Sequence, residues 1–230
     1  MRTPKLLYAA CALALLVAPA ALANGSGNGI VGSPHDFSAE SWNFRQEICR
    51  VCHVPHDHGR DIGLVGLLWN HALPNHAYTM YSSDTLDGAI DAEPTGISKM
   101  CLGCHDGTVA IDEFDKNIGS GGTLYIQDED PDARIPNVPG GEGTDLRATH
   151  PLSIVYDENA DPGLHPKTDP MGTSGTIADV LQNGKVQCSS CHDVHDSPGE
   201  AVPNTHLLRV AQTTNQGGSP SGLCLTCHAK

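Results

Sequence analysis

The sequence has few aromatic side chains and many residues that interrupt regular structure. Only 2 Trp, 5 Tyr and 3 Phe occur in 230 residues, against 25 Gly and 16 Pro. Aromatic side chains supply much of the apolar bulk of a folded core, whereas Gly and Pro break helices and strands. The composition therefore excludes an ordinary core for a chain of this size. It predicts a mostly irregular chain with short α-helices and little sheet.

Basic residues are also scarce. The chain has 13 Lys and Arg against 27 Asp and Glu, a formal net charge of −14. This balance argues against nucleic acid and anionic membranes as partners, because both are negatively charged. It is compatible with cationic partners, with metal ions and oxides, or simply with high solubility.

A long apolar run occurs only at the start of the chain. Arg2 and Lys5 precede an apolar stretch at 6–17, and small residues at 21–23 form a cleavage site, as in a signal peptide spanning 1–23. No later run is long enough to form a transmembrane segment. We expect the mature chain, 24–230, to be exported to the cell surface or extracellular space, with the periplasm as the alternative.

The cysteines are not scattered as in a disulfide framework. Outside the leader they form four pairs, each followed by histidine, in the segments CRVCH (49–53), CLGCH (101–105), CSSCH (188–192) and CLTCH (224–228). This C-x-x-C-H pattern is the attachment signature of c-type haem. In such a site two thioether bonds hold the porphyrin and the histidine binds the iron. Residues i, i+3 and i+4 share one face of a helical turn, so all three groups reach one flat macrocycle.

The pattern predicts four covalently attached haem c groups. The cofactor-binding residues are Cys49, Cys52, Cys101, Cys104, Cys188, Cys191, Cys224 and Cys227. The proximal iron ligands are His53, His105, His192 and His228. Two other interpretations, a pair of zinc ribbons and C-x-x-C redox disulfides, explain less. Neither needs a histidine behind every pair, and free thiolates survive poorly after export.

An internal repeat indicates the distal ligands. Each half has a leading histidine, then CxxCHxxH, then a plain CxxCH, so His35 corresponds to His150 and His56 to His195. His56 and His195 follow a proximal histidine too closely to reach the other face of the same haem. We therefore expect each to bind the iron of a different motif. His71 is a fifth candidate.

Other side chains leave the ligand set open. Met80 and Met171 keep Met/His ligation possible in principle. A solvated or merely hydrogen-bonded role is expected for three further histidines, His58, His76 and His165. The surplus of histidines favours bis-histidine irons. Such irons suit electron transfer and not substrate binding, so we expect no enzymatic activity.

The organisation follows from the motifs. We expect an N-terminal arm at 24–48, a first dihaem module at 49–110, a Gly-, Pro- and acid-rich insertion loop at 111–149, and a second dihaem module at 150–230. A multihaem reductase would need an open iron, often with a variant motif such as CxxCK. No such variant occurs in the sequence.

The order of motifs resembles the tetrahaem outer-membrane c-type cytochromes that polymerise into extracellular nanowire filaments. The resemblance is carried along nearly the whole mature chain by SPHDFS (33–38), CHVPH (52–56), LLWNH (67–71), CLGCHDGTVA (101–110), THPLS (149–153), CSSCHDVH (188–195), LLR (207–209) and CLTCH (224–228). It implies a multihaem cytochrome c fold wrapped around four stacked bis-histidine haems. It also implies a homopolymer in which one haem takes a ligand from the neighbouring subunit. Redox partner proteins or extracellular acceptors would receive the electrons. A monomeric periplasmic tetrahaem shuttle is the alternative.

Two positions suggest how the subunits of such a polymer would contact one another. His228 lies close to the end of the sequence, so little chain follows to cover the fourth haem. His35 follows a Gly-rich arm that we expect to be flexible. We therefore expect His35, or failing that His71, to bind iron in a neighbour by a head-to-tail contact. A contact of this type generates a filament when it does not close into a ring.

Overall fold

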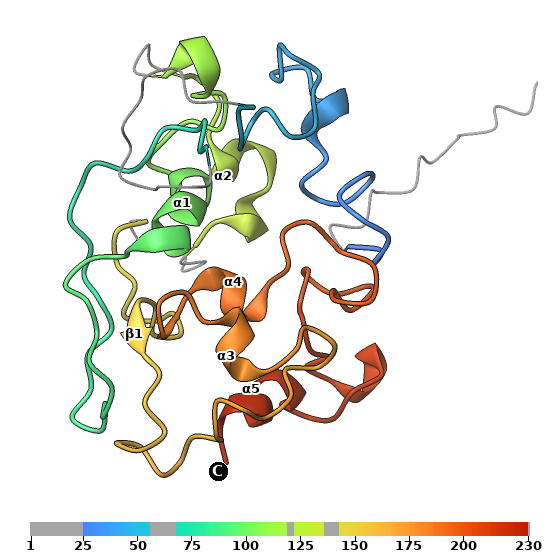
Figure 1. Cartoon of the computed structure of the whole chain (residues 1–230). Helices are drawn as coiled ribbons and strands as arrows, with labels where there is room; N and C mark the ends of the chain where they lie inside the picture. The colour runs from blue at the N-terminus through green and yellow to red at the C-terminus, as the bar shows by residue number, and fades with distance from the viewer. Residues whose placement is uncertain (1–24, 56–67, 119–121, 136–142, 230) are drawn as a thin grey trace, which may run out of the picture.

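The protein is mostly irregular chain punctuated by short helices (Figure 1). The computed structural model describes residues 25–55, 68–118, 122–135 and 143–229. Its α-helices are α1 (Gly96–His105), α2 (Ile126–Glu129), α3 (Ile177–Val180), α4 (Cys188–Cys191) and α5 (Gly222–Cys227). Its 3-10 helices are η1 (Phe37–Ala39), η2 (Asp115–Asn117), η3 (Pro131–Ala133) and η4 (Thr214–Gln216). No helix in these ranges is both long and apolar enough to cross a membrane.

The sheet consists of two very short strands. β1 (Ile154–Val155) pairs antiparallel with β2 (Lys185–Val186), with Ile154 opposite Val186. The first half of the chain joins this sheet, because the Val155 N–H donates to the Ala89 carbonyl at 2.8 Å. The sheet therefore links the two halves without forming a layer of the fold.

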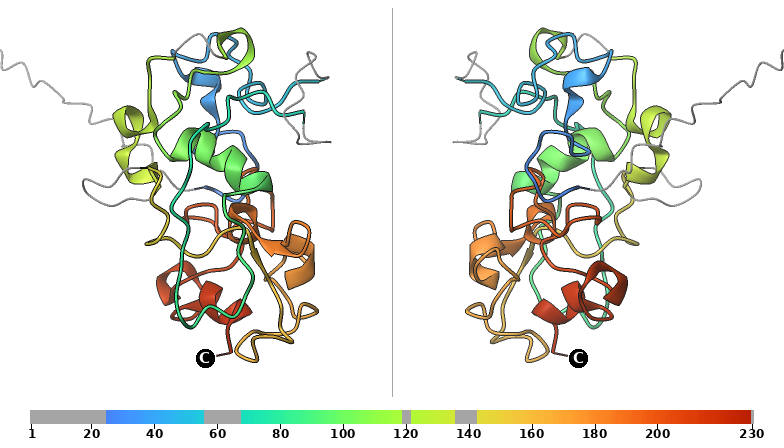
Figure 2. Two further views of the ribbon diagram at one scale, coloured as in Figure 1. Left: turned by 90° about the vertical axis from the view of Figure 1, so that its left-hand side faces the viewer. Right: turned by 90° about the vertical axis from the view of Figure 1, so that its right-hand side faces the viewer.

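The helices of the two halves lie toward opposite ends of the molecule, whereas the chain just before α1 runs along to the end that carries α5 (Figure 1, Figure 2). Both views in Figure 2 place η1, α1 and α2 toward one end, and α3, α4 and α5 toward the other. α1 contacts α4 where the halves meet. Because α1 carries the second CxxCH motif and α4 the third, these motifs meet in the middle.

The apolar core is small. One cluster joins Tyr78, Leu102 and Leu146, with Met80 and Ile135 packed against it. Among the described residues, 13 polar or charged side chains are buried against 15 apolar ones. Burial of apolar surface is the main favourable term in folding. These side chains alone therefore contribute little stabilising free energy for a chain of this length.

The internal repeat is visible in the backbone. After the first and the third motif, a returning segment pairs with the motif through two hydrogen bonds. After the first motif, Val54 donates its N–H to the Leu68 carbonyl (3.0 Å) and Asn70 donates to the Cys52 carbonyl (2.9 Å). After the third, Asp193 donates to the Leu207 carbonyl (2.7 Å) and Arg209 donates to the Cys191 carbonyl (2.9 Å). The equivalent Leu68 and Leu207 both have positive φ, 48° and 58°. Leu68 of the first half therefore corresponds to Leu207 of the second.

The described parts of the insertion at 111–149 are packed. Phe114 is fully buried and stacks on Phe44 with 4.8 Å between ring centroids. Ile135 donates its N–H to the His105 carbonyl at 2.7 Å. A few apolar side chains therefore anchor this segment, although its average composition is polar.

Candidate haem sites

Each CxxCH motif closes a single helical turn. In the first, third and fourth motifs the histidine N–H donates to the carbonyl of the first cysteine, at 2.8 Å for His53, 3.0 Å for His192 and 2.9 Å for His228. The second motif forms the last turn of α1, which ends at His105. The predicted turn is therefore present in all four motifs, and it places both sulfurs and the imidazole on one side.

The cysteines of successive motifs are neighbours in space. The Cys101 and Cys188 thiols are hydrogen-bonded, which links the second motif to the third. Burial, with a contribution from the nearby Cys104 thiol, raises the pKa of Cys52 to about 12. Burial together with the nearby Cys227 thiol raises the pKa of Cys191 to about 12. The motifs thus follow one another through the molecule in chain order. Cys49 and Cys224, in the first and last motifs, are the exposed members of the eight.

Most of the thiols do not have the low pKa expected of a zinc or redox site. The eight cysteines outside the leader are free. A reactive or metal-binding cysteine usually has a lowered pKa, whereas burial raises the pKa of Cys104 to about 12. Cys188 is the exception, because its hydrogen bond with Cys101 lowers its pKa. Within the described ranges, no group of three or more His, Cys, Asp or Glu side chains could hold a metal ion, as a zinc ribbon would require. A c-type haem iron needs only two protein ligands, since the porphyrin supplies the other four bonds.

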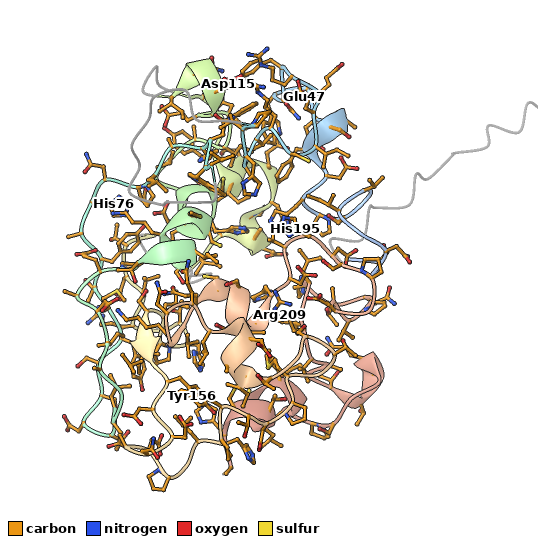
Figure 3. The ribbon with its side chains drawn as sticks, viewed as in Figure 1. Glu47, His76, Asp115, Tyr156, His195 and Arg209 are labelled. Atoms are coloured by element: carbon orange, nitrogen blue, oxygen red, sulfur yellow. The ribbon has the colours of Figure 1, made fainter. Side chains whose placement is uncertain are left out.

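Three of the four motif histidines face a second histidine. The ring centroids are 6.4 Å apart for His53 and His195, 6.0 Å for His105 and His35, and 6.3 Å for His228 and His150. The predicted distal residues His35, His150 and His195 are therefore the partners. Figure 3 shows His195 in the middle of the molecule, between the part that carries α1 and the part that carries α4.

These separations fit two imidazoles that share one metal ion. An imidazole nitrogen binds a metal at about 2.0–2.1 Å, a value taken from zinc sites. Ring bonds of about 1.33 Å place each nitrogen about 1.1 Å from the ring centroid. Two rings on opposite sides of one ion would therefore have centroids about 6.2–6.4 Å apart. The three observed separations, 6.0, 6.3 and 6.4 Å, lie within about 0.2 Å of this range.

Backbone carbonyls orient several of these rings. The Nδ1 atom lies 2.6 Å from the Ala133 carbonyl in His105, 2.7 Å from the His206 carbonyl in His192, and 3.0 Å from the Pro151 carbonyl in His150. An N–H donated from Nδ1 leaves the Nε2 lone pair available to a metal, an arrangement common around metal-bound histidine.

His35 is neutral in its position beside His105. Burial, with a smaller contribution from His105, lowers the pKa of His35 to about 3. Its Nδ1 is shielded from solvent and has no hydrogen-bond partner in the described chain. A neutral imidazole is the form that binds iron.

The third motif differs from the other three. In the described residues, no second imidazole lies opposite His192 at this spacing. The predicted distal ligand His56 falls outside the described residues, as does His58. The fourth ligand pair therefore stays a prediction.

His71 does not face any motif histidine in the described chain. It is buried, with Nδ1 2.8 Å from the Ala72 carbonyl and Nε2 3.3 Å from the Ile111 carbonyl. Its Nε2 also lies 3.4 Å from the Cys104 sulfur. In the repeat its counterpart is Val210, which supports a packing role beside the second motif.

The remaining candidate side chains have other contacts. His76 lies 3.4 Å from the Asp106 carboxylate and His165 lies 3.4 Å from the Asp169 carboxylate. Met171 is fully buried, and Met80 packs in the Tyr78 cluster.

The two positions named for a head-to-tail contact have neighbours within their own chain. His35 lies against His105 of its own chain. Part of the fourth motif is covered by its own chain, since His165 donates its N–H to the Cys227 carbonyl at 2.9 Å and Leu164 pairs with His228. Cys224, the first residue of the motif, is exposed.

Two buried aspartates were missed as members of the site. Asp106 and Asp193 directly follow the histidines of the second and third motifs, and both are buried. Asp106 accepts hydrogen bonds from the Tyr78 hydroxyl and from the N–H and hydroxyl of Thr108. The repeated CHD tripeptide was the signal in the sequence.

No family model matches the chain, and no curated protein matches it.

Proposed function

We propose that this protein is a tetrahaem c-type cytochrome that carries electrons along a chain of bis-histidine haems. The observation that supports this most strongly is the set of three imidazole pairs, at 6.0–6.4 Å between centroids. In each pair one member is a CxxCH histidine and the other a histidine distant in sequence. The order of the sulfurs through the molecule supports a linear chain.

The cysteines, the histidines and the backbone carbonyls have separate roles in this proposal. Each haem, when bound, supplies an iron that gains and loses one electron. The eight cysteines would hold the four groups covalently, and the paired histidines would bind the irons. The Ala133, His206 and Pro151 carbonyls orient three of the imidazoles. With two histidine ligands each, the first, second and fourth sites would have no place for a substrate, so we propose no enzymatic reaction for them.

We further propose that the protein is the subunit of an extracellular conductive filament. The resemblance supports this, together with the exposure of the first and last motifs at Cys49 and Cys224. If one ligand comes from a neighbouring subunit, the third motif is the place for it, because the other three pairs close within one chain. His56 of the same chain is the competing source. A monomeric periplasmic shuttle is the second candidate function, favoured by the in-chain position of His35.

Expression with a cytochrome c maturation system tests the central proposal. We expect a pyridine haemochrome spectrum typical of two thioether bonds and four haems per polypeptide. We also expect low-spin ferric signals from at least three of the four irons. Polypeptide without covalent haem, or mainly high-spin iron, would contradict the proposal.

Negative-stain microscopy of the secreted protein separates the filament from the shuttle. Ordered filaments support polymerisation, and monodisperse particles that elute as a monomer support the shuttle. A reductase would instead show an open iron together with rapid reduction of nitrite or hydroxylamine.

A further inference from the structure

The N-terminal arm is docked on the loop that carries His195. Gly25 donates its N–H to the Thr205 carbonyl at 3.1 Å, and Asn204 donates to the Gly25 carbonyl at 2.9 Å. A Cβ atom on Gly25 would lie 2.4 Å from both an Asp196 carboxylate oxygen and a Leu207 methyl carbon. The arm therefore approaches this loop more closely than any side chain at Gly25 would allow.

The Asp196 carboxylate is the main acceptor for the arm. It is fully buried and accepts the Ser26 N–H at 2.7 Å and the Gly27 N–H at 2.9 Å. Its backbone carbonyl accepts the Gly29 N–H at 2.6 Å. In the described chain no cationic side chain pairs with this carboxylate, so the arm N–H groups are its principal partners. A buried carboxylate is tolerated only when such donors satisfy it.

The same residue shapes the turn that presents His195. Asp196 has a φ of 50°, a left-handed conformation that Asp adopts more readily than most residues. Asp193 supports this turn, because its carboxylate accepts the His195 N–H at 3.3 Å and the Ser197 N–H at 2.7 Å. Within the turn, His195 reaches His53 while the neighbouring carboxylate reaches the arm.

The arm leads from this anchor directly to His35. Turns stiffen the intervening residues, since Ser33 donates its N–H to the Ile30 carbonyl and its hydroxyl accepts the His35 N–H. Seven residues separate Gly27, held by Asp196, from His35, which lies against His105. Fixing one end of this short stiff segment restricts the position of the other.

We propose that Asp196 is a positioning residue shared by two distal ligands. It anchors the arm that brings His35 to His105, and it occupies the turn that brings His195 to His53. The inference rests on the proposed function, because it assumes that these pairs bind iron. It assigns a coupling between the first and second haem sites that the motifs alone do not contain.

Carbon monoxide binding to the dithionite-reduced, fully loaded protein tests this coupling, because CO binds where an axial position is open. We expect His35→Ala and His195→Ala each to add one CO-binding iron per chain over the wild type. We expect Asp196→Ala to add two. Gly25→Val, which blocks the arm but keeps the carboxylate, should add one. Hydrogen exchange at 26–29 should become faster in both Asp196→Ala and Gly25→Val.

Matched controls use nearby residues without these roles. Glu200→Gln removes one negative charge from the same loop at a half-exposed position. Asn28→Ala removes an exposed side chain from the arm. Neither should change CO binding.

The outcomes separate this inference from the proposed function. If Asp196→Ala adds no CO-binding iron, or only one, the shared role is overturned. If His35→Ala and His195→Ala change nothing, the ligand pairs themselves are wrong. If the wild type has no covalent haem, the proposed function fails first.

Discussion

Replacing Phe114 with Ala should lower the thermal stability of the protein strongly. Phe114 is fully buried, stacks on Phe44 at 4.8 Å and lies edge-on to Trp42 at 6.3 Å between centroids. Truncation of a buried Phe to Ala costs about 3–5 kcal/mol. For a domain of about 150–250 residues each kcal/mol lowers Tm by about 2–4 °C. The Tm should therefore fall by about 6–20 °C.

Differential scanning calorimetry of the loaded protein measures this change. Phe114→Leu is the first control and should cost less than about 1.5 kcal/mol, because it keeps most of the apolar volume. Phe44→Ala is the second, and its effect should be smaller because Phe44 is 39% exposed. A Tm decrease below about 2 °C for Phe114→Ala would mean that 111–118 does not stabilise the fold. That result would refute a stabilising role for buried Phe114.

Two further substitutions test the ligand pairs and the charges near the first motif. His150→Ala should open one iron to CO, and added imidazole should close it again; unchanged CO binding would exclude the pairing with His228. Burial opposes ionisation of Asp115, but hydrogen bonds and charge from Arg45 and Arg50 outweigh it and lower its pKa. A lowered pKa stabilises the fold above the unfolded value of about 3.9, and this contribution is lost as pH falls through the folded value. Asp115→Asn should thus reduce the urea midpoint at pH 7 and do so less at about pH 2.5; an equal loss at both pH values would contradict the ion-pair assignment.

The local geometry of the motifs was predictable from the sequence. A CxxCH segment has one conformation that brings its three groups together, and the structure has that turn in all four motifs. The repeat was also predictable, because the same order of histidines and CxxCH motifs occurs in both halves of the sequence. In the structure, the backbone hydrogen bonds to the returning segments lie at equivalent positions after the first and third motifs.

The pairing of distal with proximal histidines was harder to predict. Pseudo-symmetry makes His35 equivalent to His150, and both lie against the histidine of the plain CxxCH in their own half. It does not say that His195 crosses to the other half, which depends on α1 packing against α4. Tertiary contacts between distant segments decide such choices, and residue spacing does not contain them.

The arm shows why local composition misled. A Gly-rich segment has high conformational freedom in the unfolded chain, so a flexible arm was the natural expectation. Here the missing side chain at Gly25 permits a close approach to Asp196 and Leu207. Gly25 therefore contributes to packing. This role cannot be read from the sequence of the arm, because it depends on the surface that the arm contacts.

Peptide mapping by mass spectrometry tests the central claim most directly. After acid-acetone extraction and proteolysis of the purified protein, each of the four CxxCH peptides should carry the mass of one haem. Four unmodified peptides, with their thiols free or joined as disulfides, would contradict the account.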